Sequence, residues 1–154
     1  MQEINSEILI NDRGEWWYEG NRIVHPEVLN LFKSSLTFDA ERGEFFIDYK
    51  GKRAPVKVAK TPCFIRDAVV EKSPAGELIK VVLEVDDGSR EILDPETLGL
   101  DDDGVLQVKI KAGRFAARCL AAAHFRIAEL LEEDDAGNFF IVINGVRFSV
   151  SHIN

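Results

Sequence analysis

Residues 39–56, DAERGEFFIDYKGKRAPV, recur near the end of the chain as residues 134–150, DDAGNFFIVINGVRFSV. When Phe45 is aligned with Phe139, the Phe-Phe-Ile run, two glycines and one arginine of each copy coincide. Each copy reads as a strand, a two-residue turn and a second strand, and an apolar, helix-like segment precedes it. Such an internal repeat indicates architecture, and it says nothing about chemistry.

The first copy follows a predicted hairpin and helix. Strand formers and turn residues predict a hairpin over residues 15–24. Pro26 then opens a helix whose apolar residues recur at the 3.6-residue spacing of an amphipathic helix. The first half of the chain is therefore predicted as a β-β-α-β-β unit.

In the second half of the chain, residues 114–133 can be read either as one helix or as a strand followed by a helix. The composition of residues 114–133 favours one long helix, because alanine, leucine, glutamate and arginine are good helix formers. The repeat aligns Gly113 with Gly20 and predicts a strand at residues 115–119, with the helix running only from Ala121 to Glu132. We follow the repeat.

The resulting prediction is an α+β fold of two repeated β-β-α-β-β units joined by a three-stranded antiparallel meander. The first lobe is assigned to residues 1–59, the meander and an acidic loop to residues 60–104, and the second lobe to residues 105–154. The three parts are expected to form one compact globular unit, and residues 151–154 are expected to be a tail. Only residues 94–104 read as a long loop.

Composition and charge limit the partners. The chain has 154 residues, of which 45% are hydrophobic and 30% charged, as in an ordinary globular protein. Its 27 acidic and 19 basic residues give a net charge of -8. This acidity argues against nucleic-acid binding and against docking on an anionic membrane, since both need a basic surface.

Cysteine use and hydropathy predict a cytoplasmic protein. The two cysteines, Cys63 and Cys119, lack a C-x-x-C spacing and suit free thiols in a reducing compartment. The first residues show no signal-peptide pattern, and no apolar run reaches the roughly 20 residues that span a bilayer.

The sequence favours no metal and no cofactor. The soft ligands His25, His124, His152, Cys63 and Cys119 lack the close pairs of a zinc site, so buried thiols and helix-cap histidines are expected. No nucleophile elbow and no glycine-rich phosphate loop is present. An acid–base pair of His25 with a carboxylate such as Asp48 stays open.

Aromatic and basic residues form the one cluster that suggests binding. Aromatic side chains alternate along residues 16–18, and arginines hold equivalent places in the two repeats. Such a set suits a protein partner or a small anionic ligand, while the alternative is a tryptophan-anchored core with surface arginines. The candidate residues are Trp16, Trp17, Tyr18, Arg22, His25, Arg53, Arg118, Phe125 and Arg147.

The segment Gly14–Leu36, GEWWYEGNRIVHPEVLNLFKSSL, resembles the opening of the bacterial domain-of-unknown-function family 1285. The family typically shows a G-x-W-Y-x-x-G-x-P-I-like start, followed by an apolar helix ending in L-F-x-x-x-L. This chain departs from the family at Arg22, where proline is usual, and at Thr61, where alanine is frequent. The resemblance implies an α+β fold of two similar subdomains and a role in signalling or regulation, without an established activity. The matching residues are Trp17, Tyr18, Gly20, Ile23, Leu31, Phe32 and Leu36.

Two functions remain as hypotheses. The first is a non-enzymatic regulatory or signalling-type binding module, for which exposed strand edges leave a homodimer open. The alternative is a small enzyme whose acid–base site, a histidine with an aspartate or glutamate, lies between the two lobes. A convergent pocket around His25 or His124 would favour the enzyme, and an apolar patch around Trp16 or Phe125 would favour the binding module.

Overall fold

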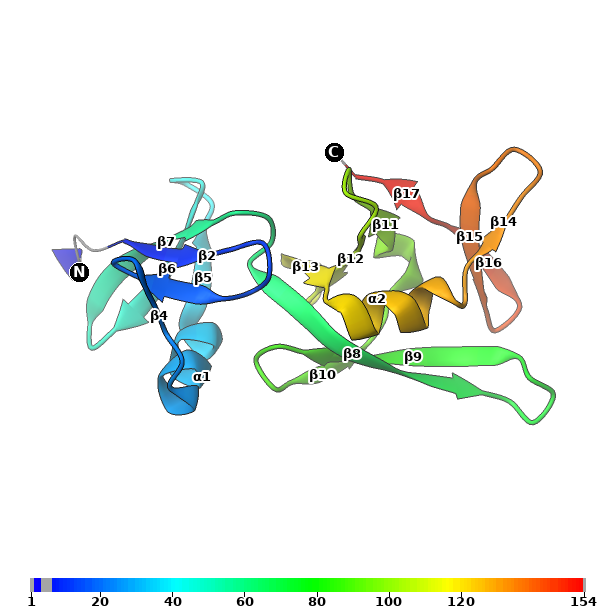
Figure 1. Cartoon of the computed structure of the whole chain (residues 1–154), viewed down its shortest axis with the longest axis horizontal. Coiled ribbons are helices and arrows are strands. Elements are labelled where there is room, and N and C mark those ends of the chain that lie inside the picture. Colours follow the sequence, from blue (N-terminus) through cyan, green and yellow to red (C-terminus); the bar gives the residue numbers. More distant parts are fainter. Residues whose placement is uncertain (1, 4–6, 154) are drawn as a thin grey trace. The chain divides into compact units, whose positions relative to one another are not determined.

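The computed structural model describes residues 2–3 and 7–153 (Figure 1). The chain divides into two compact units, residues 1–62 (unit 1) and residues 63–154 (unit 2). The predicted meander begins near this boundary, and its strands belong to the main sheet of unit 2. Each unit mixes helix and strand, so the coarse prediction of an α+β fold is confirmed.

Unit 1 is a twisted sheet covered on one face by a single helix. The strand order is β4-β3-β2-β7-β6-β5, and β1 also pairs with β7. Most pairs are antiparallel, but β1 and β2 run parallel to β7, so the sheet is mixed. Its elements are β1 Gln2–Glu3, β2 Ile8–Ile10, β3 Trp16–Tyr18, β4 Asn21–Arg22, α1 Pro26–Ser35, β5 Leu36–Asp39, β6 Glu44–Tyr49 and β7 Lys52–Val58.

Local sequence explains the helix and the hairpin of unit 1. Pro26 occupies the first turn of α1 with its φ already fixed, and Glu27 stands in the same turn, where the helix dipole favours a negative charge. Lys50 and Gly51 both have positive φ, of 52° and 75°, and so form the type I′ turn that joins β6 to β7.

Unit 2 contains two sheets. The larger has the order β10-β9-β8-β13-β12-β11-β17, and the smaller is β14-β15-β16 (Figure 1). The turn of the smaller sheet contacts the larger one, since the Asn144 N–H donates to the Leu78 oxygen at 2.9 Å. The helix α2 packs beside β8 and β13. The elements are β8 Cys63–Lys72, β9 Leu78–Val85, β10 Arg90–Ile92, the 3-10 turn η1 Pro95–Thr97, β11 Gly99–Leu100, β12 Leu106–Ile110, β13 Phe115–Cys119, α2 Ala121–Ala128, β14 Glu132–Glu133, β15 Phe139–Ile143, β16 Val146–Ser149 and β17 Ser151–His152.

The choice between helix and strand is decided in favour of the strand. Phe115, Ala117 and Cys119 are buried in alternation along β13, as expected for a strand in the sheet. The predicted helix over Ala121–Glu132 is too long, because α2 ends at Ala128. The chain leaves the helix there since Glu132 and its neighbour pair with β15.

The predicted repeated β-β-α-β-β unit is not confirmed. A hairpin, a helix and three strands follow one another in both units, but they build one sheet in unit 1 and two in unit 2. The predicted tail at residues 151–154 is wrong for the residues described, since Ser151 and His152 pair in parallel with Gly99 and Leu100.

Candidate functional site

One face of the unit 1 sheet forms an apolar pocket with α1. Val28 and Phe32 of the helix lie over Ile47 and its neighbours on the sheet, and they enclose a pocket of about 270 Å³. None of the lining side chains is charged, and the tyrosines Tyr18 and Tyr49 bring the only hydroxyl groups. The lining residues are Ile8, Tyr18, Ile23, Val28, Phe32, Ile47, Tyr49 and Ala54.

The floor and rim of this pocket differ in burial. Ile8, Ile47 and Ala54 on the sheet are almost completely buried. No residue of α1 is buried, and Val28 on the rim is 37% exposed. The helix therefore covers the sheet incompletely, and the pocket opens between the two layers.

Trp16 stands next to the pocket on the same sheet face. Alternation along β3 places Trp16 and Tyr18 on one face and Trp17 on the other. The Trp16 ring is 1% exposed and lies 6.1 Å, centroid to centroid, from the ring of Phe32. Its indole Nε1–H is buried and has no hydrogen-bond acceptor among the described residues.

The opposite face of the unit 1 sheet carries Arg53. The Arg53 guanidinium carbon lies 3.8 Å from the centroid of the Phe46 ring. One of its Nη atoms donates to Asp39 Oδ2 at 2.8 Å and to Glu44 Oε1 at 2.9 Å. The backbone N–H of Arg42 and then the Arg53 side chain lower the pKa of Asp39. Arg53 is thus held by two carboxylates of its own unit.

The other arginines predicted as site residues are also paired. Arg22 binds Glu15 at 3.0 Å, and Arg147 approaches Asp134 at 3.6 Å while stacking 3.6 Å from the Phe140 ring centroid. Arg118 Nε donates to Asp101 Oδ2 at 3.0 Å.

Asp101 is the centre of a buried polar cluster in unit 2. Its carboxylate accepts hydrogen bonds from Arg118, from the Gln107 side chain and from the backbone N–H of Val105. Burial opposes its ionisation, but these hydrogen bonds outweigh burial and lower the pKa of Asp101. The cluster fixes the loop before β12, as an aspartate does in a tight turn.

The histidines lie in three different places. His25 precedes α1, is exposed and makes no side-chain capping bond. His124 Nδ1 accepts the backbone N–H of Leu106 at 3.2 Å. His152 Nε2 lies 3.0 Å from Asp102 Oδ1, and both of these side chains are about two-thirds exposed.

Phe125 belongs to neither the pocket nor the core. It projects from α2 with 65% of its surface exposed, and its ring meets that of His124 edge-on at 5.4 Å.

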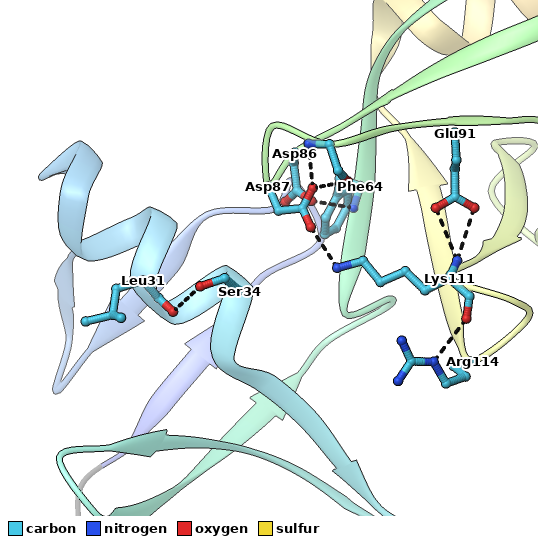
Figure 2. Close-up of polar contacts among 9 residues, drawn as sticks. Leu31, Ser34, Phe64, Asp86, Asp87, Glu91, Lys111 and Arg114 are labelled. Carbon is cyan, nitrogen blue, oxygen red and sulfur yellow. Dashed lines mark hydrogen bonds and ion pairs between the residues drawn. The ribbon is translucent and has the colours of Figure 1, made fainter.

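Both cysteines are free thiols and buried. Burial raises the pKa of both Cys63 and Cys119 to about 12. Near Cys63, Lys111 bonds to two segments of unit 2: its ammonium lies 2.7 Å from Asp87 Oδ2 in a turn, and its backbone N–H donates to Glu91 in β10 (Figure 2). Within residues 7–153 no cluster of three or more histidine, cysteine or acidic side chains could hold a metal ion.

The structure therefore separates most of the predicted site residues. Trp16 and Tyr18 share the pocket face, Trp17 and Arg53 lie on the opposite face of the same sheet, and Arg118 belongs to unit 2. Sequence reasoning did not name the pocket residues Val28 and Phe32 as site residues, although both belong to the apolar stripe of the predicted helix.

Neither of the two helices in the described part of the chain is long and apolar enough to cross a membrane.

No protein-family model matches the sequence, and no curated protein matches it. Among solved structures, the chain is similar to a DUF1285 family protein from Silicibacter pomeroyi DSS-3, with a TM-score of 0.74, 20% identity and coverage of 97% of this chain and 80% of that one. It is also similar to a DUF1285 family protein from Shewanella baltica OS155, with a TM-score of 0.59, 21% identity and coverage of 79% and 90%. The chain thus has the fold of DUF1285 family proteins, in agreement with the resemblance of residues 14–36.

Proposed function

We propose that the protein is a non-enzymatic, regulatory binding module and that the pocket between α1 and the unit 1 sheet holds its ligand. The ligand class is a small, mainly apolar molecule with one polar group for the tyrosine rim. The observation that carries this proposal is an uncharged pocket of about 270 Å³ whose floor is built from fully buried side chains. Ligand sites are typically apolar hollows with a few placed polar groups.

The size and chemistry of the pocket favour a small apolar ligand over a small anion. At about 270 Å³ it lies just below the roughly 300–1,000 Å³ of most ligand sites, so it suits a molecule of one ring or a short chain. A small anion is a poorer fit, because Arg22, Arg53, Arg118 and Arg147 each already have a carboxylate partner.

The weak anchoring of α1 supports a regulatory role. None of its residues is buried, and Phe32 makes its aromatic contacts with the sheet, so we expect the helix to shift relative to the sheet more readily than a fully packed one. A ligand that fills the pocket would gain contacts with Phe32 and Val28 and hold the helix in one position. Ligand binding would then change the exposed outer surface of α1, on which Leu31 is 48% exposed.

The test is a titration with p-cresol, which combines one apolar ring with one hydroxyl, followed by proton–nitrogen NMR of the whole chain. The two tryptophans give two separate indole signals. We expect p-cresol to shift the Trp16 signal saturably, because Trp16 adjoins Phe32, and to leave the Trp17 signal on the other face nearly unchanged.

Matched variants locate the binding site. Val28→Trp fills the pocket from its rim, whereas Val24→Trp places the same side chain at a site that is 69% exposed and does not line the pocket. The proposal requires that Val28→Trp abolish the shift and that Val24→Trp leave it intact. Equal binding by both variants, or no saturable binding by the unaltered chain, would show that the proposed pocket is not the ligand site.

A second candidate function is acid–base catalysis, favoured by the contact between His152 and Asp102. The imidazole lines a hollow of about 440 Å³ together with Gln107 and Lys109. We place this function second because both members of the pair are largely exposed, so water competes for their hydrogen bond.

A further inference from the structure

The strand β8 has an open edge for most of its length. On one side, residues 67–72 pair with β9 throughout. On the other side, β13 pairs only with residues 63–65 of β8. No other described strand pairs with residues 67–72, so one edge of this segment is open. Six residues correspond to a strand of roughly 20 Å.

Backbone hydrogen bonds identify the groups on the open edge. The backbone N–H of Ala68 donates to the side-chain Oδ1 of Asp67 at 2.8 Å instead of to a strand. In an antiparallel pair the backbone groups of alternate residues face away from the partner strand. Ala68, Val70 and Lys72 therefore direct their backbone C=O groups toward the open edge, and Val70 and Lys72 also direct their N–H groups there, while the Ala68 N–H is held by Asp67.

A groove follows this edge. Consecutive residues of β8 from Asp67 to Val70 line a hollow of about 630 Å³, and Arg126, Glu129 and Leu130 at the end of α2 form its other wall. Consecutive residues from both faces of a strand border one hollow only where that hollow runs along the strand edge. Figure 1 shows α2 lying beside β8 in the same unit.

The groove continues past Lys72. A second hollow of about 350 Å³ shares Lys72, Glu129 and Leu130 with the first and extends to Glu77 and Glu132. The two hollows together border every residue of the open segment of β8 except Glu71, so the groove is long enough for an extended peptide.

The charged side chains that line this groove indicate which kind of partner it binds. Asp67 and Arg126 neutralise each other through an ion pair of 2.6 Å. Of the remaining charged side chains, Glu77, Glu129 and Glu132 make no ion pair within the described residues, and Lys72 is the only base. A groove with this excess of acid favours a basic partner.

We propose that the open edge of β8 is a docking site for an extended, lysine- or arginine-containing segment of a partner protein. The segment adds a strand beside residues 67–72, with its basic side chains toward Glu129 and Glu132. Main-chain hydrogen bonds supply the binding and the groove walls supply the selectivity, as in other cases of strand addition. This site lies in unit 2 and does not depend on the pocket under α1.

A second copy of the chain fits this edge less well. It would bring its own Glu77, Glu129 and Glu132 to the same place, and the like charges would repel.

The test uses two capped hexapeptides in which valine alternates with lysine or with glutamate, titrated into the whole chain and followed by NMR. We expect the lysine peptide to shift the amide signals of Ala68, Val70 and Leu130, and the glutamate peptide to bind at least about tenfold more weakly. Equal binding by both peptides would contradict the assignment of a basic partner.

N-methylation of the lysine peptide tests the strand geometry without altering the protein. An added strand uses the N–H groups of alternate residues only. Methylating one alternate set should therefore weaken binding by about fivefold for each hydrogen bond lost, and methylating the other set should weaken it far less. Equal effects of the two sets would overturn strand addition.

Two protein variants complete the test. Val70→Pro removes an outward N–H from the edge, where proline is tolerated, and should abolish binding. Glu132→Gln should weaken binding, whereas Glu133→Gln, which changes an adjacent residue outside the groove, should not. If the unaltered chain forms a dimer that Val70→Pro dissociates, the edge belongs to a second copy and the proposal is wrong.

Discussion

The guanidinium carbon of Arg53 lies 3.8 Å from the centroid of the Phe46 ring, on the sheet face opposite α1. Arg53 is 16% exposed and also binds Asp39 and Glu44, so it joins β5, β6 and β7 on that face. A charged side chain that packs as well as pairs stabilises through both effects.

Arg53→Met should therefore destabilise unit 1. Methionine preserves part of the stack on Phe46 but leaves Asp39 and Glu44 without their shared cation. Both tryptophans lie in unit 1, so their fluorescence reports the unfolding of this unit in urea. We expect the midpoint of that transition to fall.

Arg147→Met is the matched control. Arg147 stacks on Phe140 in the same way, but it is 56% exposed and its ion pair with Asp134 is 3.6 Å long. Exposed pairs of this kind contribute little, so circular dichroism should record a smaller loss of stability than for Arg53→Met. An equal or larger loss would contradict the role assigned to Arg53.

Asp101 should make the stability of unit 2 depend on acid pH. Hydrogen bonds from Val105, Gln107 and Arg118 outweigh burial and hold the pKa of Asp101 below its ordinary value in the folded state. As the pH falls, Asp101 is therefore protonated in the unfolded chain, at a pKa of about 3.9, before it is protonated in the folded protein. The stabilisation is fully present above that pH and is lost as pH falls through the folded pKa.

Asp101→Asn should remove this contribution. The variant should be less stable than the unaltered chain at pH 6, and the difference should shrink between pH 4 and pH 2. Urea unfolding followed by circular dichroism at each pH measures it. Asp102→Asn changes the next residue, which is exposed, and should show no such trend. A difference that stays constant down to pH 2 would count against the ionised cluster.

The sequence predicted the strands and turns better than their assembly. Phe115–Cys119 was recognised as a strand, despite its helical composition, because Gly113 matched a turn glycine in the repeat. Gly113 indeed has a φ of 81°, which glycine adopts without strain. The assembly of sheets in unit 2 could not be predicted, because pairing between distant strands leaves no periodic pattern in either strand.

The pocket shows a second limit of sequence reasoning. The predicted apolar stripe of the helix comprised Val28, Leu29, Leu31, Phe32 and Leu36; Val28 and Phe32 do line the pocket, whereas Leu31 is 48% exposed. How closely a helix approaches a sheet depends on side chains from several strands. Ile8, Tyr18, Ile47 and Ala54 come from four separate strands, so the space left between the layers was not visible in the sequence.

Cys63 and Cys119 should resist thiol reagents in the folded protein. With the pKa raised to about 12, only about one thiol in ten thousand is ionised at pH 8. Both side chains are also buried, with exposures of 6% and 5%. Reaction with a disulfide reagent such as Ellman's reagent should follow the urea-unfolding curve of unit 2, and rapid reaction in the absence of urea would contradict this prediction.

Gly99→Ala should displace β17 from the edge of the main sheet in unit 2. A Cβ added at Gly99 would lie 2.5 Å from Ile153 Cδ1 and 3.1 Å from the backbone oxygen of Ser151. Overpacking of this kind costs about 1–3 kcal/mol in free energy of unfolding. Amide exchange at Ile153, whose N–H donates to Leu100 at 2.7 Å, should become faster.

The double variant Gly99→Ala with Ile153→Ala separates this clash from a general weakening of the strand. Ile153→Ala removes the carbon atoms that the new methyl group would meet, so the two substitutions together should cost less than the sum of their separate effects. Circular dichroism in urea measures the four free energies of the cycle. If the two effects simply add, Gly99 is not held small by Ile153, and the close packing of β17 on β11 would be contradicted.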